Sequence, residues 1–234
     1  MGSKENYYDS LFPMRLNINR PLSRPSQPIT NMTIVLDLDE TLVRSEEGSE
    51  IKLLTKYLND PKFYNRRQDM YTLTVNSSRY QTLMYGIKRP YLDIFLDFVF
   101  QYFKYVIVWS AGQYDYVHKI CNIIFNGHYR PDLIYTNDDC VIEKKVLTKP
   151  LRKVYDVNKG IDETNTLILD DRETVFQGPN PRNGILIPTY DPYLSETSTS
   201  KIDDRLVQLM RWLMLPNVRN TQDVRYLNKN FIFS

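Results

Sequence analysis

Short runs of apolar residues, each followed by polar residues or proline, recur along the chain. They cover residues 33–36, 105–109, 166–169 and 184–187. Apolar runs of this length, without alternation and rich in β-branched residues, are typical of strands buried on both faces of a sheet. We therefore predict four parallel strands.

Longer segments between and after these runs carry apolar residues at helical spacing. Residues 91–103 and 114–125 each place their apolar side chains on one stripe, which predicts amphipathic helices. A third stripe in residues 202–215 predicts a last helix that covers the sheet. Strands that alternate with helices indicate an α/β fold, a Rossmann-like parallel sheet with helices on both faces.

Residues 46–88 interrupt this alternation directly after the first strand. Within them, residues 51–58 have a helical pattern, whereas residues 71–75 and 80–85 alternate and predict a β-hairpin. We expect this hairpin to form a flap over the carboxyl end of the first strand.

The remaining segments complete the predicted organisation. Residues 130–148 have little helical period and are interpreted as a second, smaller insertion. Four prolines within residues 1–30 predict an irregular amino-terminal arm. The α/β domain is then expected to span residues 31–234.

Composition narrows the functional classes. The 234 residues are 42% hydrophobic and 25% charged, which excludes a disordered chain, and no stretch is apolar over the length of a bilayer. A net charge of +2 indicates no general attraction to nucleic acid or membrane, so neither is an expected direct partner. The chain has two cysteines, without a paired motif, and two histidines, so no usual zinc site is predicted. The low cysteine count also fits an intracellular protein, cytoplasmic or nuclear.

Polar side chains follow three of the predicted strands. Asp37 and Asp39 follow the first, Ser110 the second and Asp170 the third, and Lys149 lies between the last two. Ligands of open parallel sheets bind beyond the carboxyl ends of the strands. These side chains are therefore expected to share one site.

The chemistry that this set could perform is phosphoryl transfer from a phosphomonoester. One of the first two carboxylates can attack phosphorus, and the other can protonate the leaving oxygen and later deprotonate water. Clustered carboxylates require a cation, and hard oxygen ligands favour Mg²⁺, with Asp170 as a further ligand. Lys149 and Ser110 can stabilise the phosphoryl oxygens.

These residues resemble the motifs of the haloacid dehalogenase-like phosphatases, and the form of the motifs is similar to the Fcp/Scp-like branch. That branch comprises protein phosphatases, several of which act on the RNA polymerase II C-terminal domain. The resemblance extends from about residue 33 to 190. It is carried by residues 37–43, 88–92, 108–111, 140–149 and 168–172.

The resemblance implies a role for each matching residue. Asp37 is the nucleophile that becomes an aspartyl phosphate, and Asp39 is the general acid and base, whose backbone carbonyl binds Mg²⁺. Asp37 and Asp170 are the side-chain ligands of the metal. Ser110 and Lys149 hold the phosphoryl group, and the supporting residues are Thr41 and Asp171.

The chain also departs from the pattern of this branch. Asn137 occupies the position of an arginine that contacts substrate in the Scp-like proteins, and Pro150 follows Lys149 in place of an acidic residue. The segment 143–145 reads Glu-Lys-Lys instead of His-Arg-Gly. These differences leave substrate identity open.

The leading hypothesis is a Mg²⁺-dependent protein serine/threonine phosphatase whose partner is a phosphorylated protein or peptide, with the polymerase tail as one candidate. The alternatives are a phosphatase for small metabolites or nucleic-acid 3′ ends, and a catalytically silent adaptor. Insertions of this size suit an open cleft. The expected substrate wall consists of Tyr80, Tyr85, Tyr129, Tyr135, Asn137, Lys144 and Lys145.

Overall fold

A five-stranded parallel sheet forms the centre of the computed structural model, which describes residues 27–48, 59–76, 80–143, 145–157, 160–195 and 202–233. The strand order is β10-β9-β1-β5-β6. The bounds of these strands are β1 Thr33–Leu36, β5 Tyr105–Trp109, β6 Leu133–Tyr135, β9 Thr166–Asp170 and β10 Gly184–Leu186. Neighbouring strands are parallel throughout, which confirms the predicted Rossmann-like sheet.

Strand β6 was not predicted, because residues 133–135 were assigned to the second insertion. The structure corrects that assignment, since Leu133 and Tyr135 pair with Ile107 and Trp109 at the sheet edge. Only the later part of that segment leaves the sheet, where it forms a short antiparallel hairpin. Its strands are β7 Val141–Glu143 and β8 Val146–Thr148.

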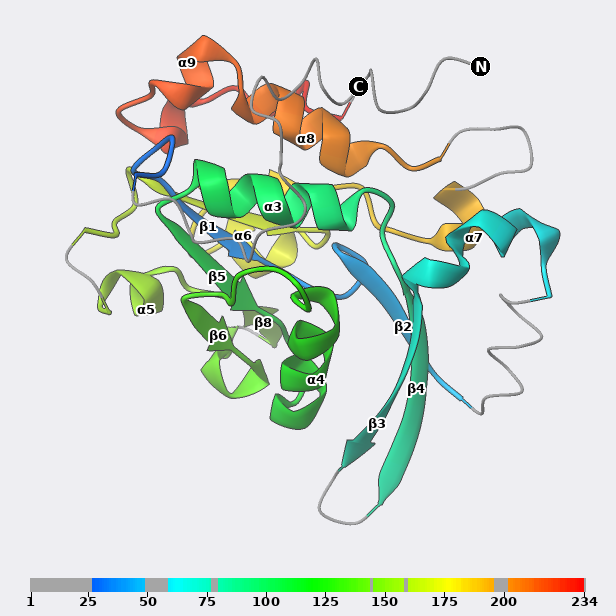
Figure 1. Ribbon diagram of the computed structural model, residues 1–234. Coiled ribbons are helices and arrows are strands. Elements are labelled where there is room, and N and C mark those ends of the chain that lie inside the picture. The colour runs from blue at the N-terminus through cyan, green and yellow to red at the C-terminus, as the bar shows by residue number, and fades with distance from the viewer. Residues whose placement is uncertain are drawn as a thin grey trace, which may run out of the picture.

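Helices cover both faces of the sheet, as predicted (Figure 1). On one face, α3, α4 and α8 enclose the larger hydrophobic core, and on the other α5 and α6 enclose a smaller one. The bounds are α3 Leu92–Tyr102, α4 Tyr114–Ile124, α5 Arg152–Tyr155, α6 Thr174–Gln177, α7 Pro192–Ser195, α8 Arg205–Leu213 and α9 Pro216–Arg219. Successive side chains of β1 enter opposite cores, Ile34 the larger and Val35 the smaller, so the strand is buried on both faces.

The first insertion forms an antiparallel sheet of three strands in the order β2-β4-β3. Its elements are β2 Val43–Glu47, the 3-10 helix η2 Pro61–Asp69, β3 Met70–Asn76 and β4 Gln81–Lys88. The predicted hairpin is thus confirmed, and β2 adds a third strand to it. Figure 1 shows this sheet, called the flap sheet below, extending away from the parallel sheet. The predicted helix at 51–58 lies outside the described residues.

The base of the flap sheet is tied to the domain by Arg89, which directly follows β4 and is 1% exposed. Its guanidinium binds both carboxylate oxygens of Asp203 and donates to the carbonyl oxygens of Thr41 and Pro188. A charge this deeply buried is stable only when it is paired and hydrogen-bonded, and here each of the three guanidinium nitrogens donates. Arg89 therefore joins segments that are remote in the sequence.

The predicted arm falls mostly outside the described residues, since only residues 27–30 of it are described. At its end, Thr30 donates its backbone N–H to the carbonyl of Tyr102 at 2.9 Å. The remaining described elements are the 3-10 helices η3 Asn137–Asp139, between β6 and β7, and η4 Val224–Tyr226, near the carboxyl terminus. No helix of the described ranges is long and apolar enough to cross a bilayer.

Candidate active site

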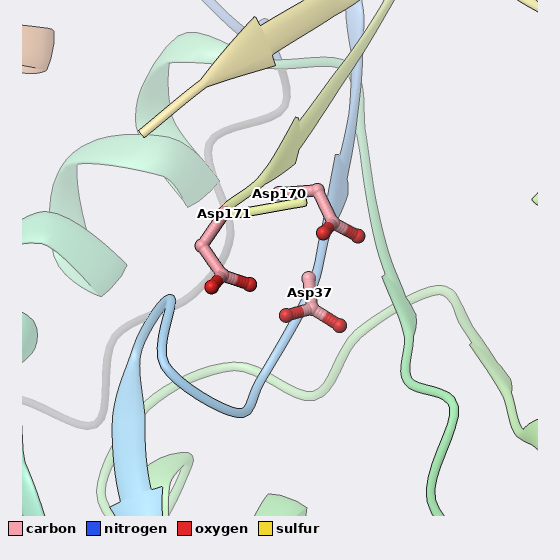
Figure 2. Close-up of side chains that lie close together, drawn as sticks. All are labelled: Asp37, Asp170 and Asp171. Carbon is pink, nitrogen blue, oxygen red and sulfur yellow. The ribbon is translucent and has the colours of Figure 1, made fainter. Parts of the chain in front are cut away.

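The register of the sheet brings the carboxyl groups of Asp37 and Asp170 together. Leu36 of β1 lies opposite Leu169 of β9, so the residues that follow them, Asp37 and Asp170, are adjacent at the carboxyl ends of neighbouring strands. Asp171 comes next in the chain, and Figure 2 shows the three carboxyl groups turned toward one another. One ligand atom from each lies within 4.8 Å of the others.

Lys149 lies between two of these carboxyl groups, those of Asp37 and Asp170. Its Nζ is 2.6 Å from Oδ1 of Asp37 and 2.6 Å from Oδ2 of Asp170, and its side chain has no solvent exposure. Burial alone would lower the pKa of Lys149, but the two carboxylates outweigh burial and raise it. The side chain is therefore an ammonium group at neutral pH.

Hydrogen bonds of its backbone hold Lys149 in place, although it does not belong to a strand of the parallel sheet. Residue 149 directly follows β8, where its N–H donates to the carbonyl of Val175 at 2.9 Å. Asn180, itself buried, donates from its side chain to the Lys149 carbonyl at 2.8 Å. These bonds satisfy the buried backbone of Lys149 and set where its side chain enters the site.

A tight turn after β1 separates Asp37 from Asp39. The N–H groups of Leu42 and Val43 both donate to the carbonyl of Leu38, at 2.8 and 3.0 Å. Glu40 within this turn has a φ of 56°, in the left-handed region. Because the chain turns here, Asp37 contacts Lys149 while Asp39 faces other partners.

The carboxyl group of Asp39 contacts two hydroxyl groups. The Tyr116 hydroxyl donates to Oδ1, and the Ser110 hydroxyl lies 3.4 Å from Oδ2. Burial raises the pKa of Asp39 to about 7, the charge of Asp37 adds to this, and the Tyr116 hydrogen bond opposes it. A carboxyl with this pKa can give up and accept a proton near neutral pH, as a general acid and base must.

Ser110 directly follows β5 and lies within reach of the same group. Its hydroxyl oxygen accepts from the N–H of Gly112 at 3.0 Å, and its own N–H donates to the carbonyl of Tyr135 at 3.1 Å. The structure thus brings together Asp37, Asp39, Ser110, Lys149 and Asp170, the five residues that the strand ends predict.

The two supporting residues, Thr41 and Asp171, also meet. The Asp171 N–H donates to the Thr41 hydroxyl at 3.1 Å, and Thr189 donates to Oδ2 of Asp171 at 3.1 Å. Burial and the charge of Asp37 raise the pKa of Asp171. Its other oxygen, Oδ1, is buried and has no hydrogen-bond partner among the described residues.

These observations fit a divalent cation. Three carboxylates and one ammonium leave two formal negative charges in a buried group, and Asp171 has a buried oxygen without a partner. Carboxylate oxygens are the ligands that Mg²⁺ prefers. Asp37 and Asp170 are the predicted side-chain ligands, and the geometry adds Asp171, directly or through water.

Two tyrosines of the predicted substrate wall pack against aromatic side chains of the hydrophobic clusters. The ring of Tyr85 is 2% exposed and packs against Phe63, and Tyr129 packs edge-on against Phe100 of the larger core. Both tyrosines were assigned to the wall because they fall in the insertions. That assignment is wrong for Tyr85, whose ring is buried in a hydrophobic cluster, whereas for the half-buried Tyr129 it stays a prediction.

The other wall residues occupy varied places. Tyr135 is half-buried beside Trp109, with ring centroids 4.9 Å apart, and Tyr80 is exposed at the start of β4. Asn137 donates its N–H to the carbonyl of Gly112, next to Ser110. Lys145 is exposed, and Lys144 lies outside the described residues. The participation of Tyr80, Tyr135, Asn137, Lys144 and Lys145 stays a prediction.

Three hydroxyl groups near Asp39 were missed in the sequence. Tyr116 contacts Asp39, Ser45 contacts Tyr116, and Tyr71 contacts Ser45. The available signal was the position of Tyr116 on the buried stripe of its helix, where a phenol needs a polar partner. The partner itself could not be read from spacing, because it depends on how the flap sheet packs.

The sequence matches the NLI interacting factor-like phosphatase family over residues 32–225. It is 30% identical over 190 residues to the CTD phosphatase-like protein 355R of Invertebrate iridescent virus 3, covering 77% of this chain and 94% of that protein. It is 25% identical over 179 residues to CTD nuclear envelope phosphatase 1B of Danio rerio, covering 76% and 67%.

Two solved structures of the RNA polymerase II CTD phosphatase Fcp1 share the fold. The fission yeast R271A variant bound to beryllium fluoride superposes with a TM-score of 0.56 at 20% identity, over 70% of this chain and 43% of that one. A second Fcp1 structure gives 0.55 at 19% identity, over 86% and 59%. This chain therefore spans about half the length of those proteins.

The matched family covers most of the chain, the fold is that of the Fcp1 phosphatases, and the predicted motif residues converge at the strand ends. The protein belongs to the NLI interacting factor-like phosphatases, in the Fcp/Scp-like branch of the haloacid dehalogenase-like superfamily.

Proposed function

We propose that the protein hydrolyses phosphoserine or phosphothreonine in protein substrates, with Mg²⁺ and through an aspartyl phosphate on Asp37. The observation that carries this proposal is the buried Lys149, which lies 2.6 Å from both Asp37 and Asp170. In this arrangement the Asp37 carboxylate is the nucleophile. The Lys149 ammonium is a preorganised partner for the phosphoryl oxygens.

In the first step, a carboxylate oxygen of Asp37 attacks phosphorus while the bond from phosphorus to the serine or threonine oxygen breaks. Asp39 donates its proton to that leaving oxygen, and Asp39 becomes a carboxylate. Lys149 and the Ser110 hydroxyl contact the equatorial phosphoryl oxygens, where negative charge accumulates.

In the second step, Asp39 takes a proton from a water molecule as that water attacks the phosphorus of the aspartyl phosphate. The bond between phosphorus and Asp37 breaks, and inorganic phosphate and the Asp37 carboxylate are released. The pKa of Asp39, about 7 in its buried setting, suits a group that must donate a proton in one step and accept one in the next.

Asp37, Asp170 and Asp171 would hold the Mg²⁺ ion, together with the backbone carbonyl of Asp39. When bound, the ion neutralises charge on the phosphoryl oxygens and orients the phosphoryl group toward Asp37. Ca²⁺ is expected to replace it poorly, because the larger ion accepts more ligands and can draw Asp37 into bidentate binding.

A protein substrate is supported by the names of the relatives, which are CTD phosphatases. It is also supported by the small size of the first insertion, whose described part consists of the flap sheet and η2. An insertion of this size suits an extended peptide substrate better than a small metabolite that must be enclosed. The phosphorylated tail of RNA polymerase II is the candidate to test first.

The test compares kcat/KM for three substrates: a phosphoserine peptide with the Ser-Pro sequence of the polymerase tail, a sugar phosphate, and a 3′-phosphorylated oligonucleotide. Each is assayed with Mg²⁺, with Ca²⁺ and with excess EDTA, and Asp37→Asn serves as the inactive control. We expect the peptide to give the highest kcat/KM, and activity to require Mg²⁺.

Two outcomes would overturn parts of this proposal. A higher kcat/KM for the sugar phosphate or the oligonucleotide would refute the protein substrate and leave the phosphatase chemistry intact. No turnover of any substrate, or full turnover in EDTA, would refute the Mg²⁺-dependent mechanism, and absence of turnover would favour a silent adaptor.

A further inference from the structure

We infer that the hydroxyl groups of Tyr116, Ser45 and Tyr71 form a chain that positions the carboxyl group of Asp39 for proton transfer. This inference rests on the proposed function, in which Asp39 is the general acid. It assigns positioning roles to three residues that lie outside the phosphatase motifs, two of them in the flap sheet.

The chain runs through three different elements. The Tyr116 hydroxyl on α4 hydrogen-bonds to Oδ1 of Asp39 and lies 2.6 Å from Oγ of Ser45 on β2. The Ser45 hydroxyl in turn lies 2.8 Å from the hydroxyl of Tyr71 on β3. Tyr116 and Tyr71 are each only 8% exposed, so bulk water does not compete freely for these bonds.

The direction of the hydrogen bonds follows from counting hydrogens. A hydroxyl group has one hydrogen, and the Asp39 carboxylate can only accept. While Tyr116 donates to Asp39, it must accept from Ser45, and Ser45 must then accept from Tyr71. Burial raises the pKa values of both tyrosines, so both keep their hydrogens and can act as donors.

This order distinguishes the two oxygens of Asp39. Oδ1 is occupied by the Tyr116 donor, whereas Oδ2 lies 3.4 Å from the Ser110 hydroxyl, on the side of the proposed phosphoryl site. A proton on Asp39 is therefore expected on Oδ2, facing the leaving oxygen. Without the Tyr116 hydroxyl, the carboxyl can rotate and either oxygen can carry the proton.

The flap sheet is shaped for this arrangement. Ser45, Gly86 and Tyr71 lie side by side on β2, β4 and β3. A Cβ at position 86 would come within 2.5 Å of the Tyr71 hydroxyl and 2.4 Å of the Arg44 carbonyl. The glycine thus lets the Tyr71 ring cross the middle strand and reach Ser45 on the far side.

The test uses the dependence of rate on the leaving group. The value of kcat/KM reports the steps through formation of the phosphoenzyme, and protonation matters most for a poor leaving group. We would measure kcat/KM for a phosphoserine peptide, which has an alkoxide leaving group, and for p-nitrophenyl phosphate, whose leaving group needs little protonation. The readout is the ratio of the two values.

Tyr116→Phe is expected to lower this ratio about tenfold, because the carboxylate that forms as Asp39 gives up its proton loses a hydrogen bond. Ser45→Ala and Tyr71→Phe should lower it by smaller factors, since they act through Tyr116. Ser45→Thr keeps the hydroxyl and should keep the wild-type ratio. Tyr114→Phe is the matched control, because that phenol is on the same helix but 63% exposed.

An unchanged ratio in Tyr116→Phe, or an equal loss with both substrates, would overturn the inference, because a purely structural defect lowers both values together. Melting temperatures of all variants show whether the fold persists. If the wild-type protein turns over neither substrate, the proposed function falls and the positioning role with it. If the wild type is active and the ratio is unchanged in Tyr116→Phe, the positioning role is refuted and the proposed function is kept.

Discussion

Both ring nitrogens of His128 face carboxylates of α3. Nδ1 lies 2.7 Å from Oδ1 of Asp97, and Nε2 lies 3.5 Å from Oδ1 of Asp93. Carboxylates only accept hydrogen bonds, so both nitrogens must be protonated for these contacts to form. Burial lowers the pKa of His128, but the hydrogen bonds and charges of the two aspartates outweigh burial and raise it to about 9.

This pKa predicts a pH dependence of stability. Because the folded pKa lies above the ordinary value of 6.5, the contribution of His128 is complete below about pH 6.5 and disappears as pH rises through about 9. We expect His128→Gln to lower the free energy of unfolding by about 1–2 kcal/mol near pH 6, after allowance for the exposed Asp93. Near pH 10, the two proteins should be equally stable.

Urea unfolding of wild type and His128→Gln at several pH values measures this difference directly. Subtracting one protein from the other cancels the other groups that titrate over the same range. A difference that is the same at all pH values would show that His128 is not an imidazolium in the folded protein.

At the residue scale, Asp37, Asp39, Ser110 and Asp170 could be predicted because each lies at the end of a recognisable buried strand. Asp37 and Asp170 lie at equivalent ends of paired strands, so their meeting follows from a parallel sheet alone. Tyr116, Ser45 and Tyr71 could not be predicted, because their contacts depend on how the flap sheet packs on α4. Tyr85 was misassigned because position along the chain does not say which way a side chain points.

At the element scale, the first turns of α4 close the outer edge of β3. The Asn76 N–H donates to Oδ2 of Asp115 at 2.7 Å, and Lys119 donates to the carbonyl of Thr74 at 2.6 Å. Asp115 and Lys119 also bind one another at 2.8 Å. Backbone groups that would be unpaired at a sheet edge are thus satisfied by a helix.

We expect this contact to hold the flap sheet beside the active site. In the double variant Asp115→Ala/Lys119→Ala, amide hydrogen exchange in residues 70–76 should quicken about tenfold, because β3 loses its outer partners. Global stability should fall by less than about 1 kcal/mol, since both side chains are near the surface. Hydrogen–deuterium exchange followed by mass spectrometry measures the change.

The matched control is Asn122→Ala/Arg130→Ala, which removes an exposed contact at the other end of α4. It should leave exchange in residues 70–76 unchanged. Equal exchange in the Asp115/Lys119 variant and in wild type would show that the flap sheet holds its place without α4.

The elements themselves differ in how far sequence defines them. Strands β1, β5 and β9 of the central sheet have side chains that enter both cores, which gives continuous apolar runs. Strand β6 has three half-buried residues, too few for a pattern, and β2 has only Val43 buried. Both exist because a neighbouring strand offers a free edge, and that information lies elsewhere in the chain.

At the scale of the whole molecule, one site is assembled from segments more than 130 residues apart in sequence. Thr41 binds the backbone of Asp171, and Arg89 joins the turn after β1 to the loop after β10 and to the residues before α8. The α/β class was predictable from alternating patterns. The Arg89 contacts were not, because a buried charge is recognised only once its partners are in place.

The transfer of phosphate to Asp37 is the step on which the proposed chemistry depends. Asp39→Asn should form the aspartyl phosphate from p-nitrophenyl phosphate and Mg²⁺ but hydrolyse it slowly, because the amide cannot deprotonate water. Asp37→Asn should form none, because a carboxamide cannot attack phosphorus.

The measurement is peptide mass spectrometry of acid-quenched Asp39→Asn after mixing with substrate. We predict one added phosphoryl group, located on Asp37, lost on treatment with hydroxylamine and absent from Asp37→Asn. A phosphoryl group on any other residue, or normal turnover by Asp37→Asn, would contradict the mechanism.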